Sequence, residues 1–383
     1  MKRPWIVLAG AIALQWGAAA AVASAPVPDS LAGPTIHFVK GVVITHTVAD
    51  AVNAVNAVNG DGESISKLTE STADSNLWAS HYIVIDPSTK IAREIKHSLQ
   101  VFRKDQTSAR RMICWYMPSD PQQFPGYTSC DLSTDQFKEL KERGSVAVNV
   151  GWINPQSSFG IGGELGRLMQ TRKHYRGVLK IVEPKPVMLS VLVNGKPRDI
   201  PTIHISGALT IGDEGGAAEF WVQDDPAEPL FVKDSFLGTT VQLTRVDLRS
   251  DASDDLTLEQ DLEKQCRANV PGIYFPTNSA ELLSPSNTEL DGLAAALQRH
   301  PQWTLSVEGH TDNIGKDSAN ADLSARRAGA VRAALVARGV PAGRIGSEGF
   351  GAKRPVAANA TVAGRAQNRR VELRRDCKAT SAS

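Results

Sequence analysis

The chain has 383 residues, of which 42% are hydrophobic and 22% are charged, and its formal net charge is +1. This length predicts two domains together with processing segments. A net charge so close to zero excludes a protein that binds nucleic acid by neutralising phosphates, and it argues against a polybasic membrane-binding patch. We therefore expect a globular protein with no nucleic acid among its partners.

The first 23 residues are typical of a secretory signal peptide. Two basic residues at positions 2 and 3 precede an apolar stretch over residues 5–22, and Ala21-Val22-Ala23 fits a small-x-small cleavage site. We expect residues 1–23 to be removed by cleavage after Ala23. A retained transmembrane anchor is the alternative, but Gln15 makes this stretch a weak span.

An exported chain with four cysteines is expected to form disulfides, because its compartment is oxidising. Three pairings are possible. Position along the chain favours Cys114 with Cys130, which closes a short loop, and Cys266 with Cys377, which brackets the C-terminal part. Four free buried thiols are the alternative.

Residues 24–248 are predicted to form a mainly antiparallel β domain, sandwich-like or a curved sheet, in a protein of the α+β class. Turn signals such as Asn194-Gly195 separate its apolar segments. A helix is expected over Thr134–Arg143, with Thr134 as its cap. Strands are expected within Thr35–Val48, around a turn at Gly41, and at Tyr82–Ile85, Leu99–Phe102, Met112–Tyr116, Val146–Val150, Val178–Val182, Val187–Val193, Ile200–Ile205, Glu219–Val222 and Val241–Val246.

A transmembrane β-barrel is the alternative architecture for this region. Its segments are shorter and less regular than the 9–11 residues that such barrels need, and many prolines interrupt them. The region also has no metal-ligand spacing, nucleophile elbow or phosphate-binding loop. We therefore expect a binding or scaffolding domain with no catalytic residue, no metal and no cofactor.

Residues 249–265 are rich in acidic residues and serine and are predicted to be a linker with a short entry helix. Residues 266–378 then alternate strand and helix patterns, which predicts a two-layer α/β sandwich. A strand is expected at Ile273-Tyr274-Phe275, and a helix is expected to start at Ser284-Pro285. Apolar residues predict further strands around Leu305 and Val307, at Ile345–Phe350 and around Val371 and Leu373, and a second amphipathic helix from Leu323 to Leu335.

Several motifs occur in order along this C-terminal part. They are Gly309-His310-Thr311-Asp312-Asn313, then Asn320-x-x-Leu323-Ser324-x-x-Arg327-Ala328-x-x-Val331, Gly349-Phe350-Gly351, and Gly364-Arg365-Ala366-x-Asn368-Arg369-Arg370-Val371-Glu372, with Phe275 and Asn278 upstream. This set resembles the OmpA-like peptidoglycan-binding domain family over about residues 266–377. An ordered set of motifs is far more specific than one short pattern.

The resemblance implies non-covalent binding of peptidoglycan through the diaminopimelate of its stem peptides, whose free end carries an ammonium and a carboxylate. By similarity, Asp312 takes the ammonium and Arg327 takes the carboxylate. Asn278 matches a pocket position and Arg369 a nearby basic one, and backbone amides after Asp312, from Asn313 onward, assist.

The chemistry of Arg327 supports this assignment independently of the family. Leu323, Arg327 and Val331 are spaced by four and lie on one side of a helix, so Arg327 is a cation in an apolar stripe and needs a partner. Its guanidinium matches a carboxylate bidentately. We expect Asp312 to orient Arg327 when the site is empty. Two alternatives to ligand binding are that Asp312 caps a turn and that Arg327 forms a structural ion pair.

The sequence therefore predicts an exported envelope protein that binds peptidoglycan and tethers a β domain to the cell wall. We expect it in the periplasm of a Gram-negative bacterium, possible partners being outer-membrane or other envelope proteins. Two alternatives stay open: a wall-tethered hydrolase with its catalytic site in the β domain, and an accessory anchor of a secretion machine.

Overall fold

The computed structural model describes residues 35–49, 62–85, 92–114, 122–152, 173–248 and 253–377. The expected signal peptide lies outside these residues. Among the described helices, none has both the length and the apolar character that a membrane span requires.

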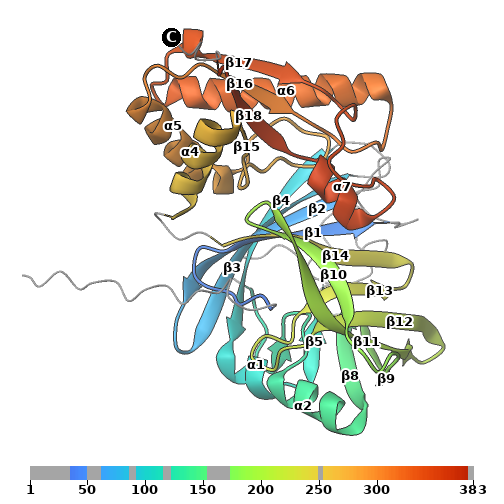
Figure 1. The fold of residues 1–383 in the computed structure, drawn as a ribbon. Helices are drawn as coiled ribbons and strands as arrows, with labels where there is room; N and C mark the ends of the chain where they lie inside the picture. The colour runs from blue at the N-terminus through green and yellow to red at the C-terminus, as the bar shows by residue number, and fades with distance from the viewer. Residues whose placement is uncertain are drawn as a thin grey trace, which may run out of the picture.

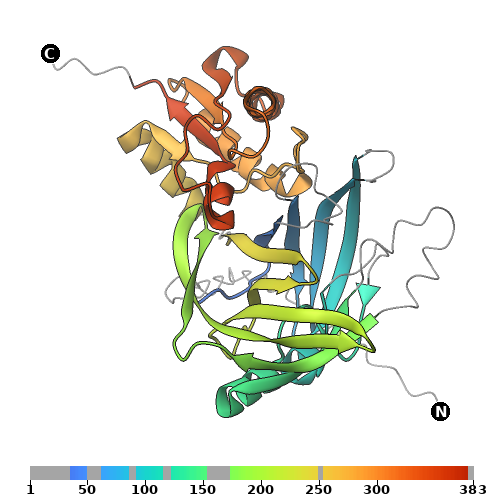
Figure 2. The ribbon, with the colours of Figure 1, turned by 90° about the vertical axis from the view of Figure 1, so that its right-hand side faces the viewer.

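The N-terminal part is one large curved sheet whose strands are mostly antiparallel, so the expected β domain is confirmed in its curved-sheet form (Figures 1 and 2). The strand order is β6-β4-β3-β2-β1-β14-β13-β12-β11-β9-β8-β5-β7, and β10 pairs with β11 and β14. The strands are β1 (Val43–Ala49), β2 (Gly62–Ser71), β3 (Ser75–Ile85), β4 (Ala92–Phe102), β5 (Arg111–Ile113), β6 (Gln122–Gln123), β7 (Tyr127–Thr128), β8 (Ser145–Trp152), β9 (Lys173–Ile181), β10 (Val187–Val193), β11 (Lys196–Ile211), β12 (Glu214–Gln223), β13 (Phe231–Phe236) and β14 (Thr239–Asp247).

The hairpin between β10 and β11 shows how the local sequence sets the register of this sheet. Asn194 and Gly195 both have positive φ, at 48° and 73°, which is the backbone form that a two-residue hairpin turn needs. Val193 therefore pairs with Lys196, and the strands continue in register to Val187 opposite Thr202. The predicted turn is confirmed.

Two helices, α1 (Arg103–Ser108) and α2 (Thr134–Arg143), pack on the sheet. The bounds of α2 agree with the prediction, but the cap assignment was wrong. Ser133, one residue earlier, accepts a hydrogen bond from the Gln136 N–H, and the Gln136 side chain accepts one from the Ser133 N–H. This capping box satisfies two free amides at once, which Thr134 cannot do from inside the helix.

The C-terminal part is a four-stranded sheet in the order β15-β18-β16-β17 with helices on one face, which confirms the two-layer α/β sandwich (Figure 1). Residues from α4, α5 and α6 pack with the sheet in one apolar core. The elements are α4 (Ser253–Gln265), β15 (Arg267–Asn269), η2 (Ser284–Ser286), α5 (Asn287–Arg299), β16 (Leu305–Gly309), α6 (Asp317–Ala337), η3 (Ala342–Arg344), β17 (Ile345–Gly349), α7 (Val362–Asn368) and β18 (Val371–Arg375).

The strand expected at Ile273-Tyr274-Phe275 is not formed, and the first strand of this sheet is β15. All three side chains are buried, at 6%, 3% and 7% exposure, so they do not alternate between a buried and an open face. Ile273 and Phe275 enter the C-terminal core, whereas Tyr274 packs against the β domain. The segment is apolar because it is buried between the C-terminal core and the β domain, so its apolar residues do not indicate a strand.

Both expected disulfides are present. Cys114–Cys130 joins residues 16 apart in sequence, and Cys266–Cys377 joins residues 111 apart. The second bond links the start of β15 to the segment after β18, so it closes the C-terminal domain at its two ends.

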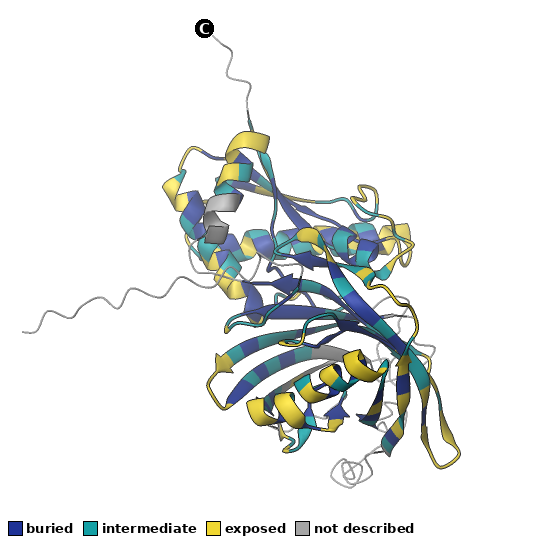
Figure 3. Cartoon of the chain, turned by 60° about the horizontal axis from the view of Figure 1, so that its bottom comes forward, coloured by how far each residue is buried: buried dark blue, intermediate teal, exposed yellow. Residues whose placement is uncertain are grey.

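The two domains are in contact. Tyr274 and Leu283 of the C-terminal domain form a buried apolar cluster with Val43 of β1 and Ile65 of β2. The Tyr274 hydroxyl donates a hydrogen bond to the buried Asp247 carboxylate at the end of β14. Helix α7 also lies against β1, β10 and β14, and in Figure 3 buried residues follow the strands where the domains meet.

Candidate functional site

Asp312 lies in the loop that follows β16, and the loop holds it in a fixed place. The Asn320 side-chain amide, from the first turn of α6, donates to the backbone carbonyls of Asp312 and Ile314 at 3.3 and 3.0 Å. One Asp312 carboxylate oxygen accepts from the Ile314 N–H at 3.0 Å. The residue is only 7% exposed. Asp312 thus makes the turn-capping contact that was the alternative to ligand binding, and its second carboxylate oxygen is left for another partner.

Helix α6 carries Arg327, and two glycines let the helix lie close to the sheet. A Cβ atom at Gly309 would lie 2.2 Å from the Ser324 carbonyl oxygen, and one at Gly349 would lie 2.2 Å from the Ala325 nitrogen. These glycines end strands β16 and β17, where they allow close packing. Their lack of a side chain brings the middle of α6 to the loop that holds Asp312.

The guanidinium of Arg327 is held by the segment just before η2. It donates to the Ser279 carbonyl at 2.8 Å and to the Pro276 carbonyl at 3.1 Å, and it lies 5.0 Å from the centroid of the Phe275 ring. Asn278 lies in this turn with φ 56°, a conformation that asparagine tolerates better than most residues. Asn278 thus shapes the loop around Arg327.

Neighbouring charged side chains act on Arg327. Burial is the largest cause that lowers the pKa of Arg327 to about 10, and the positive charge of Arg369 contributes to this lowering. The carboxylates of Glu63 and Asp312 act in the opposite direction and raise this pKa. Arg327 and Asp312 therefore share one electrostatic environment.

The structure differs from the expectation that Asp312 orients Arg327. The partner of Asp312 is Arg369, whose Nη1 lies 2.7 Å from the second Asp312 carboxylate oxygen. Arg327 is instead satisfied by the two backbone carbonyls of the 276–279 turn. The Arg327 charge therefore has no carboxylate directly paired with it among the residues that the structure describes.

Arg369 also reaches the β domain. Its guanidinium lies 2.7 Å from the Glu63 carboxylate on β2, and its Nη2 lies 3.3 Å from the Thr47 hydroxyl on β1. The Glu63 N–H donates to the Thr277 hydroxyl at 3.2 Å, beside the turn around Arg327. Sequence reasoning missed Glu63, and no local signal could have found it, because 306 residues separate it from Arg369.

The site residue Asn313 takes part through its backbone. Its N–H donates to the Asn359 side-chain oxygen at 3.3 Å, and the side chain of Asn313 is exposed. The Asn368 amide fixes Asn359 by donating to the same oxygen at 2.9 Å. This segment ties the Asp312 loop to the residues just before Arg369.

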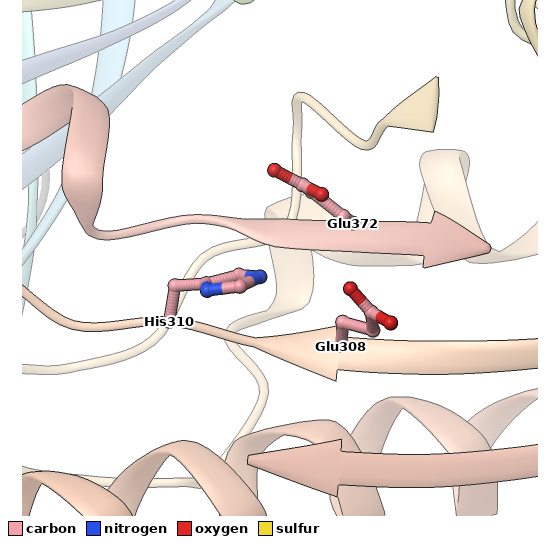
Figure 4. A group of neighbouring side chains, drawn as sticks. All are labelled: Glu308, His310 and Glu372. Atoms are coloured by element: carbon pink, nitrogen blue, oxygen red, sulfur yellow. The ribbon is translucent and has the colours of Figure 1, made fainter. Parts of the chain in front are cut away.

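A second polar cluster, Glu308, His310 and Glu372, lies on β16, β18 and the loop after β16, where the three side chains converge (Figure 4). Their ligand atoms all lie within 4.8 Å of one another. The carboxylates are already neutralised by arginines: Arg267 lies 2.8 Å from Glu308 and 3.0 Å from Glu372, and Arg370 lies 2.6 Å from Glu372. A metal ion would have to enter among these cations, so we assign the cluster to a structural ion-pair network.

The His310 side chain in this cluster is buried, at 2% exposure. Neither ring nitrogen has a hydrogen-bond partner within the described part of the chain. The ring stacks on Phe350, with centroids 5.5 Å apart. Burial, followed by the positive charge of Arg370, lowers the pKa of His310 to about 4, so the ring is neutral at neutral pH.

The fold and the site together define a two-layer α/β binding domain. Asp312 is fixed in the loop after β16 and the half-buried Arg327 is fixed on α6, and the described residues show no nucleophile paired with a base there. The comparison with known families agrees: the OmpA family matches residues 274–369. Residues 274–369 are therefore an OmpA family domain, and the expected resemblance is confirmed there.

Individual relatives are also similar to parts of this chain. "Probable lipoprotein YiaD" of Escherichia coli K12 is 34% identical over 160 residues, which are 42% of this chain and 64% of that protein. "Peptidoglycan-binding protein ArfA" of Mycobacterium tuberculosis H37Rv is 40% identical over 30% of this chain and 35% of its own length. The chain therefore spans less than two thirds of either relative.

A solved structure is also similar. The crystal structure of the peptidoglycan-associated lipoprotein from Burkholderia pseudomallei is 34% identical, with a TM-score of 0.26. The match covers 27% of this chain and 87% of that one.

Proposed function

We propose that this protein binds peptidoglycan non-covalently through the diaminopimelate of its stem peptides and tethers its β domain to the cell wall. Two proteins similar to this chain are named for peptidoglycan, one as a peptidoglycan-binding protein and one as a peptidoglycan-associated lipoprotein. These names describe binding and association with the wall, in keeping with a non-enzymatic role for this domain. We place the protein in the periplasm of a Gram-negative bacterium.

The observation that carries the proposal is the arrangement of Asp312 and Arg327. A ligand that ends in an ammonium and a carboxylate requires one anion and one cation in the same pocket. The Asp312 carboxylate is fixed by the loop after β16, and the Arg327 guanidinium is fixed by the 276–279 turn. Because Arg327 makes no direct ion pair with a described residue, its charge is available to a ligand carboxylate.

The supporting residues fit the same ligand. Arg369 fixes the position of the Asp312 carboxylate by a 2.7 Å contact, and the Asn313 backbone fixes the loop edge. Asn278 shapes the turn whose carbonyls orient Arg327. We assign ligand contact to Asp312 and Arg327, and positioning to Asn278, Asn313 and Arg369.

Sedimentation with insoluble peptidoglycan tests the proposal. The chain without residues 1–23 should co-sediment with peptidoglycan, and Asp312→Ala or Arg327→Ala should remove most of this binding. Each change leaves one ligand charge unpaired, at a cost of about 2–5 kcal/mol. If both folded variants sediment like the wild type, the pocket is assigned to the wrong residues.

A further inference from the structure

The concave face of the large sheet encloses a cavity of about 190 Å³. Alternate residues of single strands line it, as expected when side chains alternate between the two faces of a sheet. Examples are Ile44, His46 and Val48 on β1, and Val241 and Leu243 on β14. An apolar cavity of about 150 Å³ holds a molecule the size of benzene, so this one has room for a small organic ligand.

The wall of the cavity combines apolar groups with three carboxyl groups. Trp78 and Phe38 are among the apolar lining residues, and Asp131, Glu228 and Asp234 are the acids. No lysine or arginine occurs among the described residues that line it.

Asp234 is the residue that points to a ligand. It is 6% exposed and lines the cavity, yet its carboxyl group has no hydrogen-bond or ion-pair partner in the described parts of the chain. A buried polar group without a partner is costly, and native structures rarely keep one without a reason. Asp131, in contrast, accepts from the Phe231 N–H at 2.9 Å.

The electrostatics of the three acids would favour a positively charged ligand. Burial raises the pKa of Asp131 to about 8 and those of Glu228 and Asp234 to about 7. Glu228 and Asp234 also raise the pKa of Asp131, so the three groups repel one another when ionised. Around Glu228, the Arg103 charge lowers the pKa and the Asp225 charge raises it.

We propose that this cavity binds a small organic cation, an amine with an apolar body, whose ammonium group contacts Asp234 and is shared with Asp131 and Glu228. The apolar wall around Trp78 and Phe38 takes the body of the ligand. A neutral ligand of the same shape leaves the Asp234 carboxyl without a charged partner, so charge is the basis of selection.

Calorimetric titration of the chain without residues 1–23, at pH 8, tests this proposal. The probes are hexylamine and benzylamine, with the neutral controls 1-hexanol and benzyl alcohol. We expect at least one amine to bind, and to bind about thirtyfold or more tightly than its alcohol, because the alcohol offers no charge to the acids. If neither amine binds, or if alcohols bind equally well, the cation site does not exist.

Two substitutions test whether the amine binds at Asp234. Asp234→Asn should weaken amine binding about thirtyfold or more. Asp213→Asn, in the exposed turn between β11 and β12, removes an equal charge and should leave binding unchanged. Equal affinity of Asp234→Asn and the wild type overturns the assignment, and the alcohol comparison keeps the test valid if the variant does not fold.

A different observation, at the domain contact, carries a second inference. Glu63 of β2 lies 2.7 Å from Arg369, and its negative charge acts on Arg327 more strongly than that of Asp312 does. A carboxylate of the β domain thus pairs with Arg369 and also acts electrostatically on Arg327. A ligand carboxylate would bring the same charge to the same groups.

We infer, on the basis of the proposed function, that Glu63 competes with the ligand carboxylate and that the β domain restrains wall binding. The Glu63 N–H to Thr277 contact and the apolar cluster around Tyr274 hold this surface against the pocket. The restraint is released when the stem peptide replaces Glu63 at the guanidinium groups.

Sedimentation of Glu63→Gln with peptidoglycan tests the restraint, with Glu70→Gln as the matched control. Glu70 is an exposed acid on the same strand, so it reports the charge change alone. We expect Glu63→Gln to bind about tenfold more tightly, since it removes the competing charge-assisted contact, and Glu70→Gln to bind like the wild type. Unchanged or weaker binding by Glu63→Gln overturns the restraint. Asp312→Ala in the same assay reports separately on the proposed function.

Discussion

Arg327 is expected to stabilise the C-terminal domain as well as bind ligand, and Arg327→Ala measures the first role. The substitution removes two hydrogen bonds from a charged donor to the carbonyls of Pro276 and Ser279, and it removes the contact with the Phe275 ring. Hydrogen bonds of charged groups contribute about 1.5–3 kcal/mol each, and a cation–π contact adds about 1 kcal/mol. Because the freed carbonyls regain water, we expect a loss of about 3–5 kcal/mol in the free energy of unfolding.

Hydrogen exchange of α6, followed by mass spectrometry, reports this loss for the C-terminal domain alone. Arg326→Ala is the matched control. Its guanidinium is one residue earlier, is half exposed and pairs with Asp322, so its removal should cost less than about 1 kcal/mol. If the two variants lose equal stability, the contacts of Arg327 with the 276–279 turn do not hold the loop. Asp312→Ala is therefore the cleaner probe of ligand binding.

Three further predictions concern stability. Replacing Cys266 and Cys377 by serine should lower the free energy of unfolding by about 4.8 kcal/mol in the chain-entropy model, because this disulfide closes a loop of 111 residues. Replacing Cys114 and Cys130 should lower it by about 3.1 kcal/mol, because their loop spans 16 residues. Denaturant unfolding of both double variants checks this, and an equal loss contradicts the loop-length argument. The folded state keeps His310 neutral down to about pH 4, whereas the unfolded chain takes up a proton below about pH 6.5, so the wild type should lose about 3 kcal/mol as the pH falls between these values. His310→Phe should lack this part of the acid sensitivity, and identical pH profiles of unfolding would refute the assignment. Burial raises the pKa of Asp234 to about 7, so the folded state favours the protonated carboxyl group. The contribution of this group to the free energy of unfolding is therefore full below about pH 3.8 and is lost as the pH rises to about 7. Asp234→Asn should therefore be more stable than the wild type at pH 8 by about 4 kcal/mol, and little different at pH 3.5, in thermal unfolding of the β domain.

Elements with a strong local pattern were predictable from the sequence. Strand β10 and helix α2 have the predicted bounds. An apolar run between turn signals determines the bounds of β10, and a capping box with an amphipathic stripe determines those of α2. The cap of α2 was misplaced by one residue, since Ser133 and Thr134 are adjacent and both suit that position. Strand β2, which reads Gly-Glu-Ser-Ile-Ser-Lys-Leu-Thr-Glu-Ser, was missed because it is largely polar.

Contacts between distant parts of the chain were not predictable in this way. Strand β1 pairs with β14, about 200 residues later, and no local pattern specifies such a partner. Asp312 and Arg327 are predicted as site residues because ordered motifs mark both of them. The pairing of Asp312 with Arg369 and the approach of Glu63 depend on the packing of the two domains. Sequence patterns therefore proposed the site residues, whereas the structure assigns their partners.

The central claim is that the pocket recognises both charges of diaminopimelate. The most direct measurement is the affinity of the chain for a soluble stem tripeptide that ends in diaminopimelate, compared with the same peptide ending in lysine, which keeps the ammonium and lacks the side-chain carboxylate. We expect the diaminopimelate peptide to bind about thirtyfold or more tightly, because Arg327 then gains a carboxylate partner. Equal affinity for the two peptides would contradict the account.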